Sequence, residues 1–256
     1  MEAYQHHRLT LQNSIRLFDL HGAEPGSPVC GTLREVELPE DVEAAPQYLA
    51  LSYTWGLPQD ISTTPIWIGG KSLKVRKNLM LALQALRDPK DDRTFWIDAI
   101  CINQADVTEK NHQVASMSKI YRAAEAVKIW LGSADESSLA SMAYMREASK
   151  VAYSKSPTTK AEASPPLEAM SSLIQRDYWF RAWIIQEVIL AQDIDIHCGS
   201  TAMEWEIFAD VYLSMHASLP DSHSPAIQLM LQREAALQDE QLLHDQTLDS
   251  ASPRNP

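Results

Sequence analysis

The stretch FWIDAICINQADVTEKNHQV, residues 95–114, carries the features that decide the fold class. It begins with an apolar run typical of a short strand, which ends at Asp98. Asp106 and Glu109 have the spacing of a helix cap and its capping box. An apolar stripe at helical spacing follows at Val114, Met117, Ile120, Tyr121 and Ala124. The next apolar run, Ala126–Leu131, is again a strand. A strand, a helix and a strand in this order predict an α/β sheet that is parallel at least in part.

The flanking segments extend this pattern in both directions. Toward the N-terminus the sequence predicts strands at 15–20, 30–38 and 48–55, a hairpin of 66–68 with 73–75 around Gly69-Gly70, and a helix through 79–86 capped by Asn78. Toward the C-terminus it predicts helices at 135–154, 167–176 and 178–191, a strand at 194–198, a helix from about 204 and another at 226–243, with a loop at 155–166. The first third is therefore β-rich, and the middle alternates strands with helices.

Composition and charge narrow the classes of function. The chain has 256 residues, 45% of them apolar and 22% charged, which is ordinary for a globular protein. Lys and Arg number 22 against 34 Asp and Glu, so the formal net charge is −12. Nucleic acids and anionic membranes attract a basic face, so we expect neither as a partner. With no apolar N-terminal stretch that predicts a signal peptide, we expect a cytoplasmic protein.

No generic catalytic or metal-binding motif is present. The sequence lacks GxGxxG, a P-loop, GxSxG and HExxH. Cys30, Cys101 and Cys198 are far apart and form no CxxC pair, so they predict reduced thiols and neither a disulfide framework nor a zinc site. We expect no metal and no required cofactor.

Three longer blocks are more specific. They are YLALSYTWG at 48–56, the stretch that begins at 95 and continues to AVKIWLG at 126–132, and RDYWFRAWIIQEVILA at 176–191. In this order they closely resemble the heterokaryon incompatibility (HET) domain of fungi, which is linked to non-self recognition and programmed cell death. The HET domain is regarded as a distant relative of TIR domains, many of which cleave NAD with a glutamate on a helix.

The resemblance implies a fold and a domain organisation. The fold class it implies is α/β, with a TIR-like, flavodoxin-like sheet flanked by helices and an added N-terminal β-hairpin element. The HET domain would span residues 48–203, after an N-terminal β-rich extension at 1–47 that packs on it. A C-terminal helical extension would cover 204–245, and 246–256 would form a disordered tail.

Glu187 is the candidate catalytic residue. Trp183 and Glu187 resemble the TIR arrangement of an aromatic residue, three further residues and a glutamate. Independently of any family, a continuous helix would place Glu187 inside an apolar stripe of Phe180, Trp183, Ile184, Val188 and Ala191. A carboxylate there must be paired, hydrogen-bonded or protonated. The structural alternative is a buried ion pair with Arg122, Arg176 or Arg181.

The candidate substrate-binding residues follow two predicted strands, where open α/β sheets bind ligands. They are Ser52, Tyr53, Trp55, Gly56, Asp98, Asn103, Gln104 and, from the helix of Glu187, Trp183. An aromatic wall of Trp55, Trp96 or Trp183 could stack on nicotinamide or adenine. For each tryptophan the alternative is core packing, for Asp98 a turn or capping role, and for Asn103 and Gln104 the satisfaction of loop backbone.

Two hypotheses of function remain open. In the first, the domain is an NAD(P) glycohydrolase that uses Glu187, takes NAD(P) as its substrate and is active when self-associated. In the second, it is a non-catalytic death-signalling adaptor that acts through oligomeric contacts. Both fit self-association and an upstream activating protein as partners. A third alternative is a truncated or regulatory relative, because the chain lacks the long C-terminal region of many HET proteins.

Overall fold

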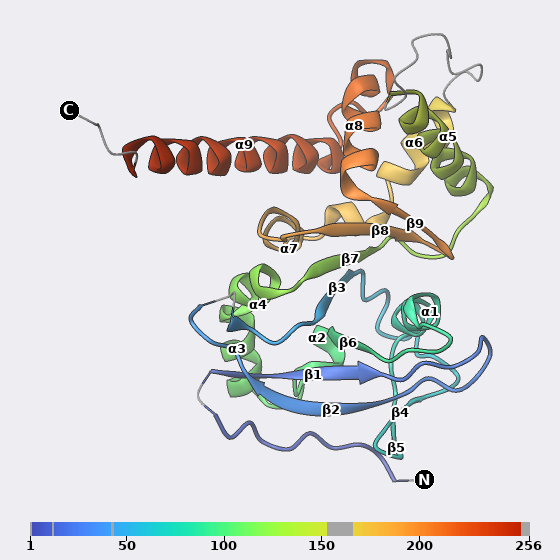
Figure 1. The fold of residues 1–256 in the computed structure, drawn as a ribbon. Coiled ribbons are helices and arrows are strands. Elements are labelled where there is room, and N and C mark those ends of the chain that lie inside the picture. Colours follow the sequence, from blue (N-terminus) through green and yellow to red (C-terminus); the bar gives the residue numbers. More distant parts are fainter. Residues whose placement is uncertain (1, 12, 42–43, 153–165, 252–256) are drawn as a thin grey trace.

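The computed structural model describes residues 2–11, 13–41, 44–152 and 166–251 of the chain (Figure 1). Its strands are β1 (Ser14–Leu20), β2 (Cys30–Glu37), β3 (Leu49–Tyr53), β4 (Ile66–Ile68), β5 (Lys71–Leu73), β6 (Arg93–Trp96), β7 (Ala126–Trp130), β8 (Ile194–Cys198) and β9 (Thr201–Glu204). Its α-helices are α1 (Lys77–Leu86), α2 (Asp98–Cys101), α3 (Val107–Ala115), α4 (Met117–Ala123), α5 (Glu136–Ala152), α6 (Leu167–Ile174), α7 (Ile184–Ile189), α8 (Trp205–Met215) and α9 (Pro225–Ala251).

All of these strands form one mixed sheet. Their order within the described residues is β5-β4-β2-β1-β6-β3-β7-β8-β9. The central strands β6, β3, β7 and β8 are parallel, whereas β1 pairs antiparallel with β6 and β9 antiparallel with β8. The parallel centre confirms the α/β class. The antiparallel pair of β4 and β5 confirms the hairpin at Gly69-Gly70, but its second strand is 71–73, directly after the two glycines, and not 73–75 as predicted. The N-terminal strands belong to the same sheet, since Phe18 of β1 lies opposite Phe95 of β6.

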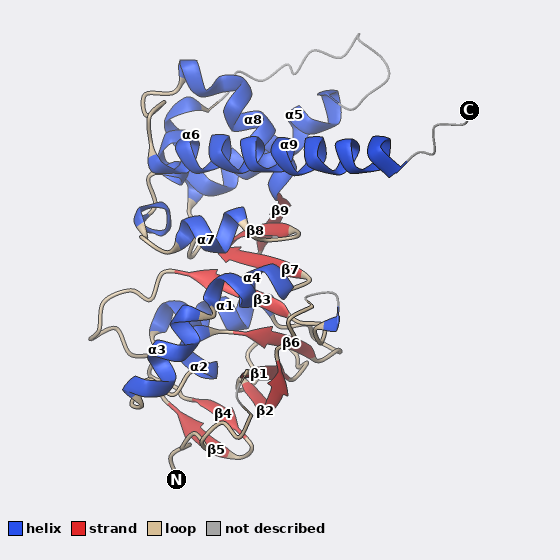
Figure 2. Cartoon of the chain, turned by 90° about the vertical axis from the view of Figure 1, so that its left-hand side faces the viewer, coloured by secondary structure: helices blue, strands red, loops and turns tan. Residues whose placement is uncertain are grey.

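Helices cover both faces of the parallel strands. Figure 1 shows α3, α4 and α7 on one side of the strands and α1 on the other. Figure 2 shows α5, α6, α8 and α9 gathered at the β9 end of the sheet. The strands β3 and β7 are buried along most of their length, as expected for strands covered on both faces.

The connections place α1 and α3–α4 on opposite faces for a topological reason. The chain leaves β3, passes through α1 and returns as β6 on one side of β3. It then passes through α2–α4 and returns as β7 on the other side of β3. Because parallel crossovers have a constant hand, this reversal of direction puts the two connections on opposite faces. A crevice therefore opens between the carboxyl ends of β3 and β6.

The helix predicted at 178–191 is not continuous. A short 3-10 helix at Asp177–Phe180 is followed by extended backbone at Arg181, and α7 begins only at Ile184. The apolar stripe is broken accordingly, because Phe180 and Trp183 are 62% and 51% exposed while Ile184, Glu187 and Val188 are buried.

Two other local predictions are also corrected. The helix expected through the stripe that ends at Ala124 is divided at Ser116 into α3 and α4. Asn78 is not a cap: Arg76 precedes α1, and the Asn78 amide instead joins two strand ends, donating to the Thr54 carbonyl and accepting from the Trp130 indole. Asp106 is confirmed as the cap of α3, because its carboxylate accepts from the backbone of Thr108 and Glu109, but the capping box is not closed, since the Glu109 side chain accepts from the backbone of Asn103 and not of Asp106.

The C-terminal end differs from the expected tail. Helix α9 continues to Ala251, so residues 246–251 are helical where the sequence predicts a disordered tail, and residues 252–256 lie outside the described part. Most of the loop expected at 155–166 also lies outside it. Cys30, Cys101 and Cys198 are free thiols, as predicted.

Candidate functional site

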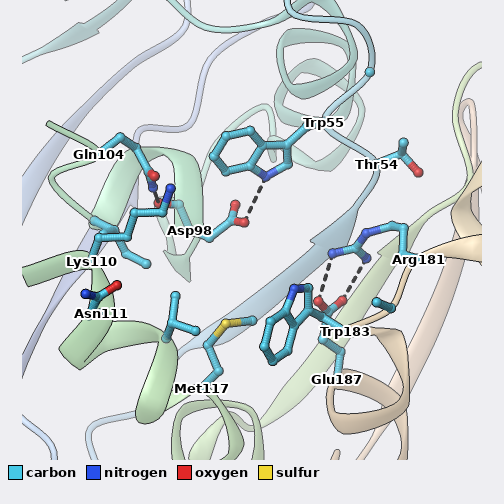
Figure 3. A pocket seen from close by; sticks show the side chains of 14 residues that line it. Thr54, Trp55, Asp98, Gln104, Lys110, Asn111, Met117, Arg181, Trp183 and Glu187 are labelled. Carbon is cyan, nitrogen blue, oxygen red and sulfur yellow. Dashed lines mark hydrogen bonds and ion pairs between the residues drawn. The ribbon is translucent and has the colours of Figure 1, made fainter. Parts of the chain in front are cut away.

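A cavity of about 600 Å³ occupies the crevice between β3 and β6. One wall is built from Thr54, Trp55 and Gly56, which follow β3, and another from Asp98 and Gln104, which follow β6. Its remaining walls come from α3, α4 and the turn into α7, and they contribute Lys110, Asn111, Val114, Met117, Arg181, Ala182, Trp183 and Glu187. Figure 3 shows Trp55 and Trp183 on facing sides of this cavity, with Asp98 opposite the Arg181–Glu187 pair.

Glu187 lies at the inner wall with its carboxylate fully engaged. Its two oxygens each accept from one terminal nitrogen of Arg181, at 2.8 Å. One of them also accepts from the Ser52 hydroxyl, which bonds to the Tyr178 hydroxyl at 2.7 Å. Glu187 is 0% exposed, and the Arg181 side chain is 19% exposed. The ion pair that the sequence left open among three arginines is therefore made by Arg181.

The extended backbone at Arg181 is what makes this pair. It ends the 3-10 helix and lets the guanidinium reach a carboxylate six residues further along the chain. Burial lowers the pKa of Arg181, but the adjacent Glu187 carboxylate outweighs burial and holds that pKa above its ordinary value. Burial also raises the pKa of the Tyr178 phenol, and the negative charge of Glu187 adds to this. The guanidinium thus stays charged beside the carboxylate.

Asp98 is the second carboxylate of the cavity. It accepts a hydrogen bond of 2.8 Å from the Trp55 indole nitrogen, which orients that indole as a wall, and one of 2.7 Å from the backbone of Ala99. Burial raises the pKa of Asp98 to about 6, and the negative charge of Glu187 contributes to the rise. Burial, together with the nearby Asp98 carboxylate, also holds the pKa of the Tyr53 phenol well above its ordinary value.

The predicted binding residues divide into those that line the cavity and those that do not. Trp55, Gly56, Asp98, Gln104 and Trp183 line it, and Gln104 donates to the Asp98 carbonyl at 2.9 Å. Gly56 has φ +75°, a backbone conformation that side-chain-bearing residues rarely adopt.

Ser52 and Tyr53 do not line the cavity, because both are buried on β3. Ser52 donates to Glu187, and the phenol of Tyr53 lies close to Asp98. Asn103 does not line the cavity. Its side chain accepts from the backbone N–H of Ala105 and so satisfies a donor of the loop that leads into α3. Trp96 is fully buried in the core, which is the structural alternative for that tryptophan.

Sequence reasoning missed the α3 wall. Val114 lies four residues after Lys110 and three after Asn111, so both flank it on one side of the helix, but this spacing carries no chemistry by itself. Lys110 adds a second cation to the cavity beside Arg181. Among the described residues, no group of three or more His, Cys, Asp or Glu side chains could hold a metal ion. Within the same residues, no helix has the length and apolarity needed to cross a membrane.

Comparison with known proteins assigns the family. Over an alignment of 227 residues the chain is 29% identical to heterokaryon incompatibility protein 6, OR allele, of Neurospora crassa. The alignment covers 72% of this chain and 33% of that relative, so the chain spans about a third of the relative's length. No solved structure matches the chain significantly. The heterokaryon incompatibility protein (HET) family matches residues 48–187, which is more than half of the chain, and the protein therefore belongs to the HET family.

Proposed function

We propose that this protein acts in heterokaryon incompatibility and the associated cell death, and that it does so as an NAD(P) glycohydrolase with Glu187 as the catalytic residue. One observation carries the proposal: a single cavity at the switch point of the sheet brings together two carboxylates and two tryptophans that are far apart in sequence. The role in incompatibility rests on family membership and on the name of the Neurospora relative.

The cavity suits a nucleotide in size and lining. Its volume lies within the range of about 300–1,000 Å³ that is usual for ligand and cofactor sites. The indoles of Trp55 and Trp183 offer faces on which a pyridine or purine ring could stack. Lys110 and Arg181 are cations that would suit the phosphates of a dinucleotide.

Cleavage of the bond between nicotinamide and ribose requires mainly a carboxylate placed beside the ribose. Nicotinamide leaves NAD as a neutral base, and positive charge builds up on the ribose ring as it departs. A carboxylate beside the ribose stabilises that charge and can accept hydrogen bonds from the ribose hydroxyls, as in glycoside hydrolysis. Glu187 lines the cavity, and it can take this role once its pair with Arg181 opens.

A TIR-like organisation is part of the same proposal. The parallel centre of the sheet, with helices on both faces and a reversal of strand order beside β3, supports the flavodoxin-like comparison. Trp183 and Glu187 both line the cavity, which also supports the likeness to the aromatic residue and glutamate of TIR domains. The break before α7 separates the two residues, so that Trp183 lies outside the helix of Glu187.

The Arg181–Glu187 pair must open before Glu187 can meet a ribose. Both carboxylate oxygens are occupied, and Glu187 is 0% exposed. Arg181 lies in a short non-helical segment flanked by the exposed side chains of Phe180 and Trp183. Self-association, or an upstream activating protein in the cytoplasm, would act by shifting this segment and freeing the carboxylate.

The test is nicotinamide release from NAD by the purified chain over a series of protein concentrations that includes assembled material. We expect Glu187→Gln to lower the rate of nicotinamide release by at least about 100-fold, because it removes the charge that stabilises the cation. Glu206→Gln, at an exposed position on α8, is the matched control and is expected to keep full activity. Equal release by Glu187→Gln, with its fold intact by circular dichroism, would exclude Glu187 as the catalytic residue.

The sealed ion pair favours a second candidate function. If Glu187 only ties α7 to the Arg181 segment, the domain would be a non-catalytic adaptor that signals death through oligomeric contacts. The absence of release at every concentration, for wild type and variant alike, would support the adaptor. Glu187→Gln would then still trigger cell death when expressed in fungal cells, whereas the glycohydrolase requires that this variant be inactive there.

A further inference from the structure

The two carboxylates of the cavity are unequally engaged. Glu187 is held by both terminal nitrogens of Arg181 and by Ser52. Asp98 accepts from three neutral donors, the indole of Trp55, the backbone of Ala99 and the phenol of Tyr53, and among the described residues no Lys or Arg forms a salt bridge with it. A carboxylate offers about four acceptor positions, so these donors leave about one on Asp98, whose charge, unlike that of Glu187, is not paired with an arginine. Figure 3 shows its carboxylate directed into the cavity, toward the Arg181–Glu187 pair.

We propose that Asp98 is the general base of the hydrolysis, which accepts a proton from the water that attacks the ribose while Glu187 stabilises the positive charge on the ribose. This inference rests on the proposed glycohydrolase function and divides its work between the two carboxylates. The division follows from their environments: Glu187 is paired with Arg181 until that pair opens and its charge becomes free to stabilise the cation, whereas Asp98 has neutral donors and faces the cavity.

The bond between ribose C1′ and the nicotinamide nitrogen breaks, and its electron pair leaves with the nicotinamide, which becomes neutral. A lone pair of the water oxygen forms the new bond to C1′, and Asp98 takes one proton from that water. Release of this proton to solvent regenerates the carboxylate, so that NAD and water yield ADP-ribose, nicotinamide and one proton.

The environment of Asp98 suits a base of moderate strength. A general base works best when its pKa lies near the operating pH, and burial raises the pKa of Asp98 to about 6. The charged and titratable groups around Asp98 are Glu187, Arg181, the phenols of Tyr53 and Tyr121 and the buried Cys101 thiol. The indole of Trp55 and the backbone of Ala99 each hold one oxygen of Asp98, and the carboxylate faces the cavity, from which a water molecule can reach it.

The experiment separates attack by water from attack by a nucleophile that needs no base. Wild type and Asp98→Asn are given NAD with and without 3-acetylpyridine, whose ring nitrogen attacks C1′ without losing a proton. We expect Asp98→Asn to lower ADP-ribose formation by about 100-fold, a typical contribution of a general base. Exchange of nicotinamide for 3-acetylpyridine is expected to change by less than about threefold, because the variant leaves formation of the cation intact.

Controls keep this result distinct from failure of the proposed function. Asp91→Asn, at an exposed turn position, should change neither product. Glu187→Gln should lose hydrolysis and base exchange together, since both pass through the same cation. In Asp98→Ala, azide should restore turnover as glycosyl azide, because the anion attacks without a base.

Three outcomes would overturn the inference. Equal losses of hydrolysis and exchange in Asp98→Asn would show that Asp98 binds substrate without acting as a base, while the glycohydrolase stands. Unchanged hydrolysis in Asp98→Asn would give Asp98 no role in the reaction. No nicotinamide release by wild type at any concentration would exclude the proposed function and this inference with it.

Discussion

Two buried arginine–glutamate pairs in this protein differ in what surrounds them. In the first, Arg16 of β1 binds Glu109 at the start of α3, with side chains 5% and 8% exposed. In the second, Arg181 binds Glu187 at the cavity wall, with side chains 19% and 0% exposed. Both are two-pronged contacts, the strongest form of this interaction.

The two pairs differ in the other groups that they bind, and this difference indicates a structural role for the first pair and a functional role for the second. Arg16 also donates to the backbone carbonyls of Cys101 and His7, and Glu109 accepts from the backbone of Asn103. That pair therefore joins three segments through main-chain groups. The Arg181–Glu187 pair is bonded instead to the side chain of Ser52, and it shares a cavity with a second carboxylate, Asp98. A buried ion pair is thus informative about function only through its neighbours.

Breaking the first pair should have the largest effect on stability. We expect Arg16→Met to lower the free energy of unfolding by about 3–5 kcal/mol, because it leaves Glu109 buried without its counter-ion. Urea denaturation measures this value. The double variant Arg16→Met with Glu109→Gln should recover part of the loss, since the amide keeps an acceptor for Asn103. A loss below about 1 kcal/mol in the single variant would contradict the structural role.

Removing the charge of Asp98 should raise the free energy of unfolding at neutral pH, whereas Arg16→Met lowers it. Its folded-state pKa of about 6 lies above the ordinary value of 3.8, so the folded protein takes up a proton more readily than the unfolded chain. Stability due to this group is therefore fully present below about pH 4 and is lost as the pH rises toward 6. We expect Asp98→Asn to be more stable than wild type at neutral pH, by about 2–3 kcal/mol, and to lose this advantage at pH 4.

The comparison with Glu109 sharpens this prediction. The pKa of Glu109 is lowered, mainly because Arg16 and the backbone of Asn103 outweigh its burial, so Glu109→Gln should destabilise the protein at neutral pH. His197 also titrates in this range: burial lowers its pKa to about 4, and its contribution is lost as the pH falls from 6.5 to 4. His197 is common to wild type and Asp98→Asn, so it cancels in their difference. A difference independent of pH would contradict the raised pKa of Asp98.

The smallest effect is expected at an exposed pair. Lys71 and Glu2 form a salt bridge with side chains 45% and 73% exposed. We expect Lys71→Ala to change the free energy of unfolding by less than about 1 kcal/mol, because solvent screens the pair and ordering both side chains costs entropy. Thermal denaturation at low and high salt measures the change, which should shrink further at high salt. A larger loss would mean that the N-terminal segment depends on this contact for its position.

The sequence predicted the elements whose signals are local. The helix cap at Asp106, the hairpin at Gly69-Gly70 and the apolar run of β7 each depend on residues within a few positions of one another, and the structure confirms all three. The family follows in the same way, from blocks of contiguous residues. Where a local signal was overridden, a distant partner is responsible: Asn78 serves the ends of β3 and β7, and so it does not cap α1.

The tertiary structure alone decided how the site is assembled. Ser52 and Glu187 are 135 residues apart, and Trp55 and Asp98 are 43 apart, so no periodicity within one element could pair them. Their contacts follow from the order of strands around β3, which opens a crevice where the crossovers change face. Helical spacing alone predicted that Trp183 and Glu187 share one helix, whereas the contact of Arg181 with a buried carboxylate accompanies a break in that helix. Local sequence thus determined the elements and the family, and long-range packing determined which of their ends meet, because only the folded sheet brings distant charges into one low-dielectric site.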